Sequence, residues 1–227
     1  MAGQWTQVST STRVGVCILV VVAALIVAVW PQATGRDDTV PAQRQSAADT
    51  ASQPAAAASD LVAARAKAQL SPCPVPGPPV SAASPLRGVT LDCLAGPPAV
   101  DIARAGAGRP MFINYWAFWC GPCRTELPIV AEYASRAGQR VQVLTVQGVD
   151  GAQRPDLSLK LLTDIAVHLP TAVDTQGRLA AAVGFPRVYP TSVLIRPDGT
   201  VAALLPRVFR SSDEIARAVE QYLAVTT

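Results

Sequence analysis

The sequence is poor in charge, and its basic residues form no cluster. Only 15% of its 227 residues are Asp, Glu, Lys or Arg, and the net charge at pH 7 is +3. A protein that binds nucleic acid needs a basic patch or stripe, and no run of Lys and Arg supplies one here. Nucleic acid is therefore not an expected partner. The length is that of one domain with additional segments.

Charge is missing altogether from an apolar run near the N-terminus. The run from Val14 to Trp30 reads VGVCILVVVAALIVAVW, and its length is at the lower end of the roughly 17–25 residues of a spanning helix. It has no polar face, which a buried core helix would show. Pro31 and Gln32 follow it, and they match the small-residue cleavage site of a signal peptide poorly. We expect a retained transmembrane anchor in the lipid bilayer, with a cleaved signal peptide as the alternative.

The charges beside this run indicate its orientation. Arg13 and the amino terminus precede it, whereas Arg36 is accompanied on the far side by Asp37 and Asp38. Because positive charge is retained on the cytoplasmic side, residues 1–13 are expected inside the cell. The expected location is the cell membrane, crossed once, with the rest of the chain on the extracytoplasmic side.

Residues 31–70 contain few large apolar side chains. They are rich in Ala, Gln, Ser and Thr, with AAAA at 55–58. Such a segment buries too little apolar surface to fold alone, so it predicts a flexible tether. A weak helical pattern at 59–70 is its one sign of regular structure.

The remaining residues, 71–227, show the alternation of a folded α/β domain. Two apolar strands, 111–116 and 141–149, flank an amphipathic helix at 121–137. Strands that alternate with helices, followed by a hairpin and a last helix, predict a mixed central sheet flanked by helices, with one antiparallel edge. The other expected elements are a strand at 89–94 behind a proline-rich start, a helix at 156–168, a strand at 171–173, a helix at 178–183, a hairpin of 191–195 and 201–205, and a helix that begins at Ser211 or Ser212.

The strongest motif is Trp119-Cys120-Gly121-Pro122-Cys123, where the first apolar strand ends and the helix begins. A helix N-terminus presents unpaired N–H groups and the positive end of the helix dipole, which stabilise a thiolate and lower the pKa of its cysteine. Cys120 is therefore predicted to be the exposed nucleophile. Cys123 lies about one turn on, faces inward, and is predicted to resolve the mixed disulfide with a substrate.

The same two cysteines have a second interpretation as half of a zinc site. Zinc needs four ligands, commonly supplied as paired CxxC motifs or clusters of Cys and His. The other candidate ligands are Cys73, Cys93 and His168, and none forms a second pair at zinc-finger spacing. A structural disulfide is also an alternative, although the Gly-Pro at a helix start is not needed for one. We expect a redox pair, with no metal and no cofactor.

Cys73 and Cys93 bracket the proline-rich stretch and are interpreted as a structural disulfide. An oxidising compartment outside the cytoplasm permits the bond. Closing a loop of about 20 residues contributes about 3 kcal/mol in the chain-entropy model. The alternative is a second redox pair that passes electrons to Cys120, although neither cysteine stands at a helix start.

The motif and its surroundings resemble the thioredoxin superfamily. Residues 110–137, beginning PMFINYWAFWCGPCRTELP, resemble its active-site strand and helix, and the likeness extends over about residues 85–227. Three features are closer to the TlpA/ResA-type membrane-anchored oxidoreductases: Asn114 where thioredoxins have a buried Asp, Glu126 three residues past the second cysteine, and an anchor and tether ahead of the domain. The resemblance implies a thioredoxin-like fold and thiol-disulfide oxidoreductase activity.

The resemblance also suggests roles for residues around the cysteines. Because Asn114 cannot titrate, Glu126 is expected to accept protons and tune the thiol pKa values. Its alternative is an ordinary solvated acid in the first turn of a helix. The sequence of 188–191 resembles the loop with the family's cis-proline, so Tyr189 and Pro190 are expected to bind an extended substrate, and Trp119 to shield the site and contact substrate. An ordinary trans proline at a strand start is the alternative for Pro190.

Together these observations predict an enzyme that reduces disulfides in exported proteins. The resemblance implies apocytochrome c as a substrate before haem attachment, and a membrane protein of the thiol-relay kind as electron donor. Two alternatives stay open. The same chemistry can run in reverse, in an oxidase or isomerase of secreted proteins, or the cysteines can serve as ligands in a haem- or metal-handling chaperone.

Overall fold

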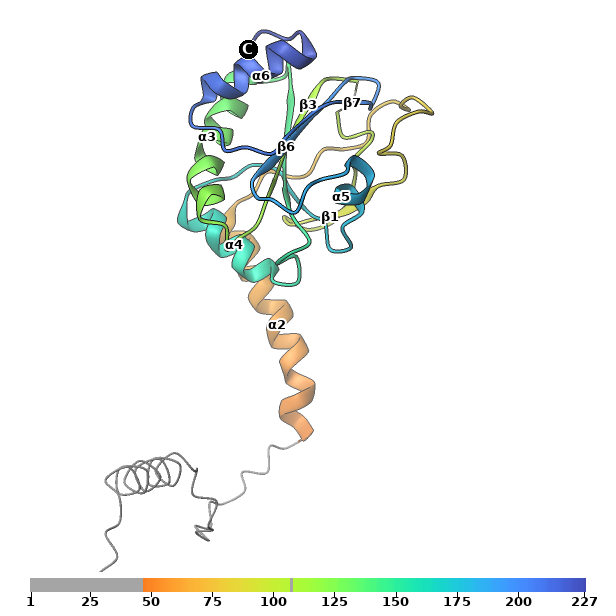
Figure 1. The fold of residues 1–227 in the computed structure, drawn as a ribbon. Coiled ribbons are helices and arrows are strands. Elements are labelled where there is room, and N and C mark those ends of the chain that lie inside the picture. The colour runs from red at the N-terminus through yellow and green to blue at the C-terminus, as the bar shows by residue number, and fades with distance from the viewer. Residues whose placement is uncertain (1–46, 107) are drawn as a thin grey trace, which may run out of the picture. The chain divides into compact units, whose positions relative to one another are not determined.

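The computed structural model describes residues 47–106 and 108–227, and Figure 1 shows their arrangement. The predicted membrane-spanning run, Val14–Trp30, lies outside the described residues, as does the tether up to residue 46. Within the described ranges, no helix has both the length and the apolar character that crossing a membrane requires.

A mixed sheet of seven strands forms the centre of the domain, in the order β2-β1-β5-β4-β3-β6-β7. The three central strands β5, β4 and β3 run parallel to one another, and their outer neighbours β1 and β6 run antiparallel to them. The edge strands β2 and β7 pair antiparallel with β1 and β6. The sequence predicted one antiparallel edge, because nothing local to residues 89–94 reveals that this strand pairs with β5 in the reverse direction. The strands are β1 (Thr90–Cys93), β2 (Val100–Asp101), β3 (Met111–Trp116), β4 (Gln142–Gln147), β5 (Thr171–Val173), β6 (Thr191–Ile195) and β7 (Val201–Leu205).

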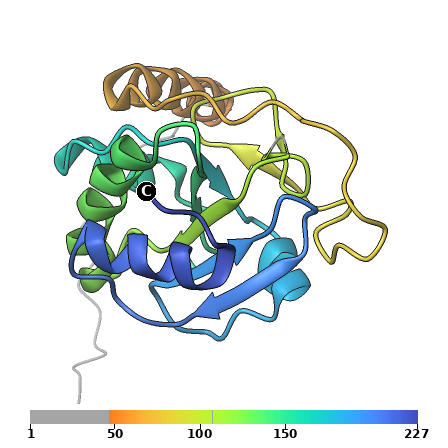
Figure 2. The same cartoon turned by 90° about the horizontal axis from the view of Figure 1, so that it is seen from above.

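Strand β3 is buried along its whole length because both faces of the sheet are covered. Its alternate residues Phe112 and Trp116 pack on the side of α3 (Gly121–Ala137), α4 (Pro155–Asp164) and α6 (Ser212–Leu223). Met111, Ile113 and Tyr115 pack on the opposite side, with α5 (Arg178–Val183). Figure 2 shows α3 and α6 on one face of the sheet and α5 on the other. The predicted thioredoxin-like α/β fold is confirmed.

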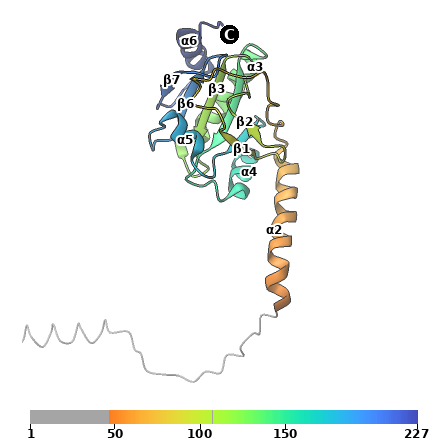
Figure 3. The same cartoon turned by 90° about the vertical axis from the view of Figure 1, so that its right-hand side faces the viewer.

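The segment predicted as a flexible tether differs from that expectation in its last part. Residues Ala47–Ala68 form the helix α2, whose C-terminal end lies beside β1 and α4 in Figure 3. Leu61, Ala64 and Ala68 follow one another at helical spacing and pack in the same apolar cluster as Trp116. Alanine is the best helix former, and its small side chain permits close packing, so few large residues are needed. The folded unit therefore begins before residue 71.

Hydrogen bonds also join the end of α2 to the domain. Arg65 Nε donates to the carbonyl of Leu94 at 3.0 Å, and the backbone N–H of Ser71 donates to the carbonyl of His168 at 2.8 Å. A ring nitrogen of His168 lies 2.8 Å from the carbonyl oxygen of Ala68. His168 therefore lies at the C-terminus of α2, whereas the sequence placed it at the end of a helix at 156–168.

Candidate active site

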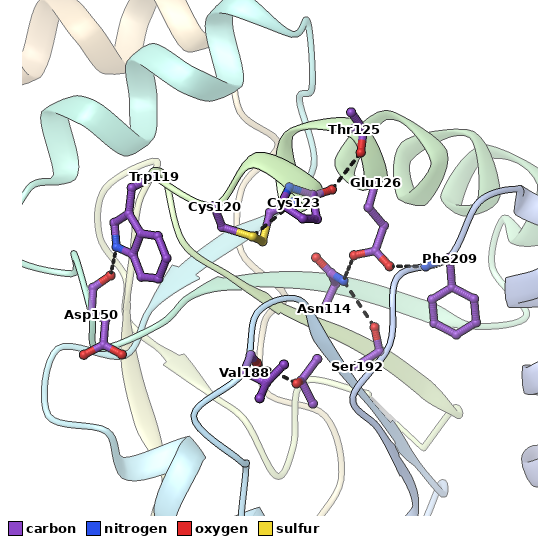
Figure 4. The surroundings of a disulfide bond; sticks show 12 residues. Asn114, Trp119, Cys120, Cys123, Thr125, Glu126, Asp150, Val188, Ser192 and Phe209 are labelled. Carbon is purple, nitrogen blue, oxygen red and sulfur yellow. Dashed lines mark hydrogen bonds between the residues drawn. A yellow bond between two sulfur atoms is a disulfide. The ribbon is translucent and has the colours of Figure 1, made fainter.

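Cys120 is the N-cap of α3, and three residues separate it from the end of β3 at Trp116. Its Sγ accepts a hydrogen bond from the backbone N–H of Cys123 at 3.1 Å. Pro122 occupies the first turn, where no N–H is required and a φ near that of a helix is already set. Cys120 and Cys123 form a disulfide with their Cα atoms 5.2 Å apart, shown in Figure 4. The N–H donor and the helix dipole both favour negative charge on the sulfur of Cys120.

The two cysteines differ in exposure less than the sequence suggested. Cys120 is 5% exposed and Cys123 is fully buried. Cys120 is the more exposed of the two cysteines, as expected. The prediction that Cys120 is exposed is nevertheless wrong for the disulfide form. Both cysteines pack within the apolar cluster that includes Ala117 and Leu127.

Glu126 lies one turn past Cys123 and is fully buried. Its Oε1 accepts from the backbone N–H of Phe209 at 2.7 Å, and its Oε2 accepts from Nδ2 of Asn114 at 2.9 Å. Burial raises the pKa of Glu126 to about 7, against the opposing effect of these two hydrogen bonds. The alternative of a solvated first-turn acid does not hold. A carboxyl group with this pKa exchanges protons efficiently near neutral pH.

Trp119 stands beside the disulfide and is 57% exposed. Its Nε1 donates to the carbonyl of Asp150 at 2.8 Å, and its ring meets Tyr189 edge-on, with 5.5 Å between centroids. The hydroxyl of Tyr189 donates to Oδ2 of Asp150 at 3.2 Å, and its ring stacks on Tyr115 at 5.6 Å. Burial raises the pKa of Tyr189 to about 12, so the hydroxyl keeps its proton. The indole is therefore held in one place on the surface.

Tyr115 connects the surface rings of Trp119 and Tyr189 to the interior of the domain. Its hydroxyl donates to Oδ2 of the buried Asp174 at 3.1 Å and accepts from the backbone N–H of Val149 at 3.1 Å. Gly148 lies against both tyrosine rings: a Cβ there would come within 2.5 Å of Tyr189 and 2.6 Å of Tyr115. A glycine is required at this position because the rings occupy the space of a side chain.

The bond between Tyr189 and Pro190 is cis. Pro190 is buried, whereas Val188 before it is 51% exposed. The hydroxyl of Thr191 donates to the carbonyl of Val188 at 2.7 Å. Among the described residues, none forms a hydrogen bond with the backbone N–H or carbonyl of Tyr189. The sequence placed Tyr189 and Pro190 beside the cysteines, and Trp119 packs directly on Tyr189.

Cys73 and Cys93 form a second disulfide, with 5.9 Å between their Cα atoms. Cys93 is buried at the end of β1, and Cys73 lies 3.4 Å from the carbonyl of Thr171 on β5. The bond joins the proline-rich segment to the sheet. Neither residue stands at a helix N-terminus. Within the part of the chain that the structure describes, no group of three or more His, Cys, Asp and Glu side chains is placed to hold a metal ion.

Asp150, Ser192 and Phe209 are among the residues of the site that were not found from the sequence. Asp150 follows β4, and the carboxyl ends of the parallel strands β3 and β4 meet at one edge of the sheet, so its position after a buried strand was a usable signal. Ser192 lies opposite Asn114 in the antiparallel register of β3 and β6. Phe209 acts through its backbone, which leaves no signal in the side chains.

Comparisons with known proteins agree with this geometry. The ResA thiol-disulfide oxidoreductase of Bacillus thuringiensis subsp. konkukian is 27% identical over 122 residues, which are 53% of this chain and 65% of the relative. ResA of Bacillus subtilis is 28% identical over 99 residues, or 43% of this chain and 53% of the relative. The chain thus spans 53–65% of the length of these two relatives.

Solved structures support the fold. A secreted thiol-disulfide isomerase from Corynebacterium glutamicum superposes with a TM-score of 0.52 and 21% identity, over 61% of this chain and 83% of that one. The model of the AhpC/TSA family matches residues 90–204, just over half of the chain. The chain therefore belongs to the AhpC/TSA family and is similar to the TlpA/ResA-type oxidoreductases.

Proposed function

We propose that this chain is a thiol-disulfide oxidoreductase that reduces disulfides of exported proteins. The observation that carries the proposal is the Cys120–Cys123 disulfide at the start of α3, with the N–H of Cys123 donating to the sulfur of Cys120. The curated relatives support it, since they are named thiol-disulfide oxidoreductases.

In the proposed reaction the reduced Cys120 is the nucleophile. Its thiolate attacks a substrate disulfide, one substrate sulfur leaves as a thiolate, and a mixed disulfide remains. Cys123 then gives up its proton and attacks the sulfur of Cys120, which releases the second substrate sulfur and closes the Cys120–Cys123 bond. Glu126, buried one turn away, accepts the proton of Cys123. Two electrons pass from the enzyme to the substrate.

The substrate is an extended polypeptide segment that lies across Trp119, Tyr189 and Pro190. The exposed indole of Trp119 offers an apolar contact beside Cys120. The free backbone N–H and carbonyl of Tyr189 offer the two hydrogen bonds by which an extended strand is held. Disulfide-bonded apocytochrome c fits this substrate class.

The direction of electron flow is towards the substrate. Gly121 and Pro122 add no cation that would stabilise the thiolate of Cys120 beyond the helix itself, and a less stabilised thiolate makes a more reducing pair. The charge of Glu126 disfavours a nearby thiolate further. A membrane protein of the thiol-relay kind supplies the electrons that return the pair to its reduced form. The run Val14–Trp30 anchors the chain in the bilayer, with residues 1–13 in the cytoplasm and the catalytic domain outside.

Two measurements on the full chain test the activity. Insulin should be reduced in the presence of dithiothreitol, and the variant with Cys120→Ser and Cys123→Ser should show no rate above background. Equilibration with glutathione should place the pair nearer thioredoxin, at about −270 mV, than a strong oxidase, at about −120 mV. A value at the oxidase end would overturn the reducing direction and favour an oxidase or isomerase.

Topology is tested separately. An alkaline phosphatase fused after Thr227 should be active in cells, because that enzyme requires an oxidising compartment. A fusion that is produced but inactive would contradict the extracytoplasmic location of the domain.

A further inference from the structure

The side-chain amide of Asn114 forms hydrogen bonds through its NH₂ group and none through its carbonyl oxygen. Nδ2 donates to Oε2 of Glu126 at 2.9 Å and to Oγ of Ser192 at 3.2 Å, which uses both of its hydrogens. Oδ1 is buried, and among the described residues it has no hydrogen-bond partner. Figure 4 shows the amide between Glu126 and the disulfide, with Oδ1 on the side of the disulfide. A buried acceptor without a partner is destabilising, because it has lost its hydrogen bonds to water.

The orientation of this amide depends on whether Glu126 carries a proton. An ionised carboxylate can only accept, so it requires the NH₂ end of Asn114. A protonated carboxyl group is also a donor. Because Oε1 faces the N–H of Phe209, its proton belongs on Oε2, opposite Asn114. Two donors would then face each other, and the contact would be lost.

A rotation of the amide by 180° resolves this conflict. Oδ1 then takes the place of Nδ2 and accepts from the protonated Oε2 of Glu126 and from the hydroxyl of Ser192, one on each lone pair. The same rotation turns the NH₂ group towards the cysteines. With Glu126 ionised, Cys123 is faced by a carbonyl oxygen, which favours the thiol. With Glu126 protonated, it is faced by N–H donors, which favour the thiolate.

We propose that Asn114 is a positioning residue whose amide rotates with the protonation of Glu126 and thereby couples that proton to the ionisation of Cys123. This inference rests on the proposed oxidoreductase function. In the resolving step the S–H bond of Cys123 breaks and an O–H bond forms on Oε2 of Glu126. The amide rotates, and its N–H groups stabilise the new thiolate. The thiolate attacks the sulfur of Cys120, and the substrate leaves as a thiolate, so no further oxidant is needed.

Few other titratable or charged groups lie around Glu126, so the coupling involves mainly Glu126 and Cys123. Strand β6, which provides Ser192, has no titratable residue, and the titratable Tyr115 of β3 packs on the opposite face of the sheet. Helix α3 brings Cys123 to this side. The segment with Phe209 brings two cations, Arg207 and Arg210, and the guanidinium of Arg207 lies over the Phe209 ring, 4.6 Å from its centroid.

The decisive experiment follows the Cys123 titration by its ¹³Cβ chemical shift, in the full chain with only the Cys120–Cys123 bond reduced. Asn114→Ala is measured with Glu126 present and with Glu126→Gln, whose NH₂ group mimics the protonated acid. With Glu126 the substitution should lower the pKa of Cys123 by about one unit, because a carbonyl oxygen is removed. With Glu126→Gln it should raise that pKa by about one unit, because a donor is removed. The same direction in both backgrounds would overturn the proposal.

Ser192→Ala is the matched control. The Ser192 hydroxyl can serve either orientation of the amide, so its removal should shift the Cys123 titration in the same direction in both backgrounds. A reversal of sign there would mean that any loss of polar contact in this region produces the effect, and it would count against a special role of Asn114.

A second measurement needs no substitution, so it does not depend on variants that fold. In the reduced wild-type chain, nuclear Overhauser contacts of the Asn114 NH₂ group should move from Glu126 to the β-protons of Cys123 as the pH falls below about 7. Contacts that stay with Glu126 at every pH would refute the rotation. If that chain reduces insulin, the inference alone has failed. If it does not, the proposed function has failed as well.

Discussion

The backbone N–H of Phe209 donates a hydrogen bond to the carboxylate of Glu126 at 2.7 Å, across 83 positions of the chain. This contact joins the segment that precedes α6 to the helix that carries both redox cysteines. Together with the amide of Asn114 it supplies each oxygen of the buried acid with a donor. The acid is therefore held in place by two elements besides its own helix, which a role in proton exchange requires.

Glu126→Gln should change how the free energy of unfolding depends on pH. The pKa of Glu126 is raised from 4.5 to about 7, so between these values the folded chain holds a proton that the unfolded chain has released. This stabilisation is present below pH 4.5 and is lost as the pH rises through about 7. The loss amounts to about 3 kcal/mol. Urea titrations at pH 4.5 and pH 8 should show the variant gaining about this much relative to the wild type.

Glu220→Gln controls for the removal of one carboxylate, since Glu220 is exposed on α6. Parallel pH profiles of the Glu126→Gln variant and the wild type would contradict the raised pKa of Glu126.

The two redox cysteines should differ when they are replaced singly. Cys123→Ser should accumulate mixed disulfides with substrates, because Cys120 still attacks but the resolving thiol is missing. Cys120→Ser should trap little, since Cys123 is fully buried and lies behind the first turn of α3. Non-reducing gels of cells that produce each variant provide the measurement. Equal trapping by both variants would refute the division of roles.

The disulfide between Cys73 and Cys93 should stabilise the domain without taking part in catalysis. It closes a loop with a sequence separation of 20. Replacing both cysteines by Ser should lower the free energy of unfolding by about 3 kcal/mol in the chain-entropy model. Insulin reduction at 25 °C should persist, as long as the variant remains folded by circular dichroism. A folded variant without activity would instead favour an electron relay to Cys120.

Gly148→Ala should destabilise the domain and disturb the surface beside the cysteines. The new Cβ would lie within 2.6 Å of both tyrosine rings, Tyr115 and Tyr189, which are fixed by stacking and by hydrogen bonds. Overpacking of this kind costs about 1–3 kcal/mol. Thermal unfolding measures the loss, and the fluorescence of Trp119, which touches Tyr189, should change.

Gly121→Ala is the matched control for stability, because a Cβ at Gly121 meets no atom within 4 Å. If both alanine variants unfolded at the same temperature as the wild type, the packing argument for Gly148 would be wrong.

The active-site helix shows how much of the structure can be predicted from the local sequence. The bounds predicted for it, 121–137, are those of α3, because the N-cap, the proline of the first turn and the apolar spacing all lie within the segment itself. The redox pair could be predicted in the same way, since two cysteines separated by two residues at a helix start indicate redox chemistry without reference to the rest of the chain. The central strands and the closing hairpin were found for the same reason.

The last part of the predicted tether shows where composition misleads. Residues 31–70 have few large side chains, so the sequence predicted a flexible tether with only a weak helical pattern at 59–70. The end of this segment packs because α4, together with Leu94 after β1, presents an apolar surface on which a helix with small side chains fits. Whether an alanine face is buried depends on its partner, and that partner follows about 90 positions later in the chain.

By itself, the sequence determined the thioredoxin-like order of elements, the cysteine pair and its place at a helix N-terminus. Only the tertiary structure decided the surroundings of that pair: the amide of Asn114 between β6 and α3, the burial of Glu126 beneath Phe209, and the fixed indole of Trp119. The physical reason is distance along the chain. Motifs act through neighbours within a few residues, whereas desolvation and the choice of hydrogen-bond partner depend on segments that meet only after folding.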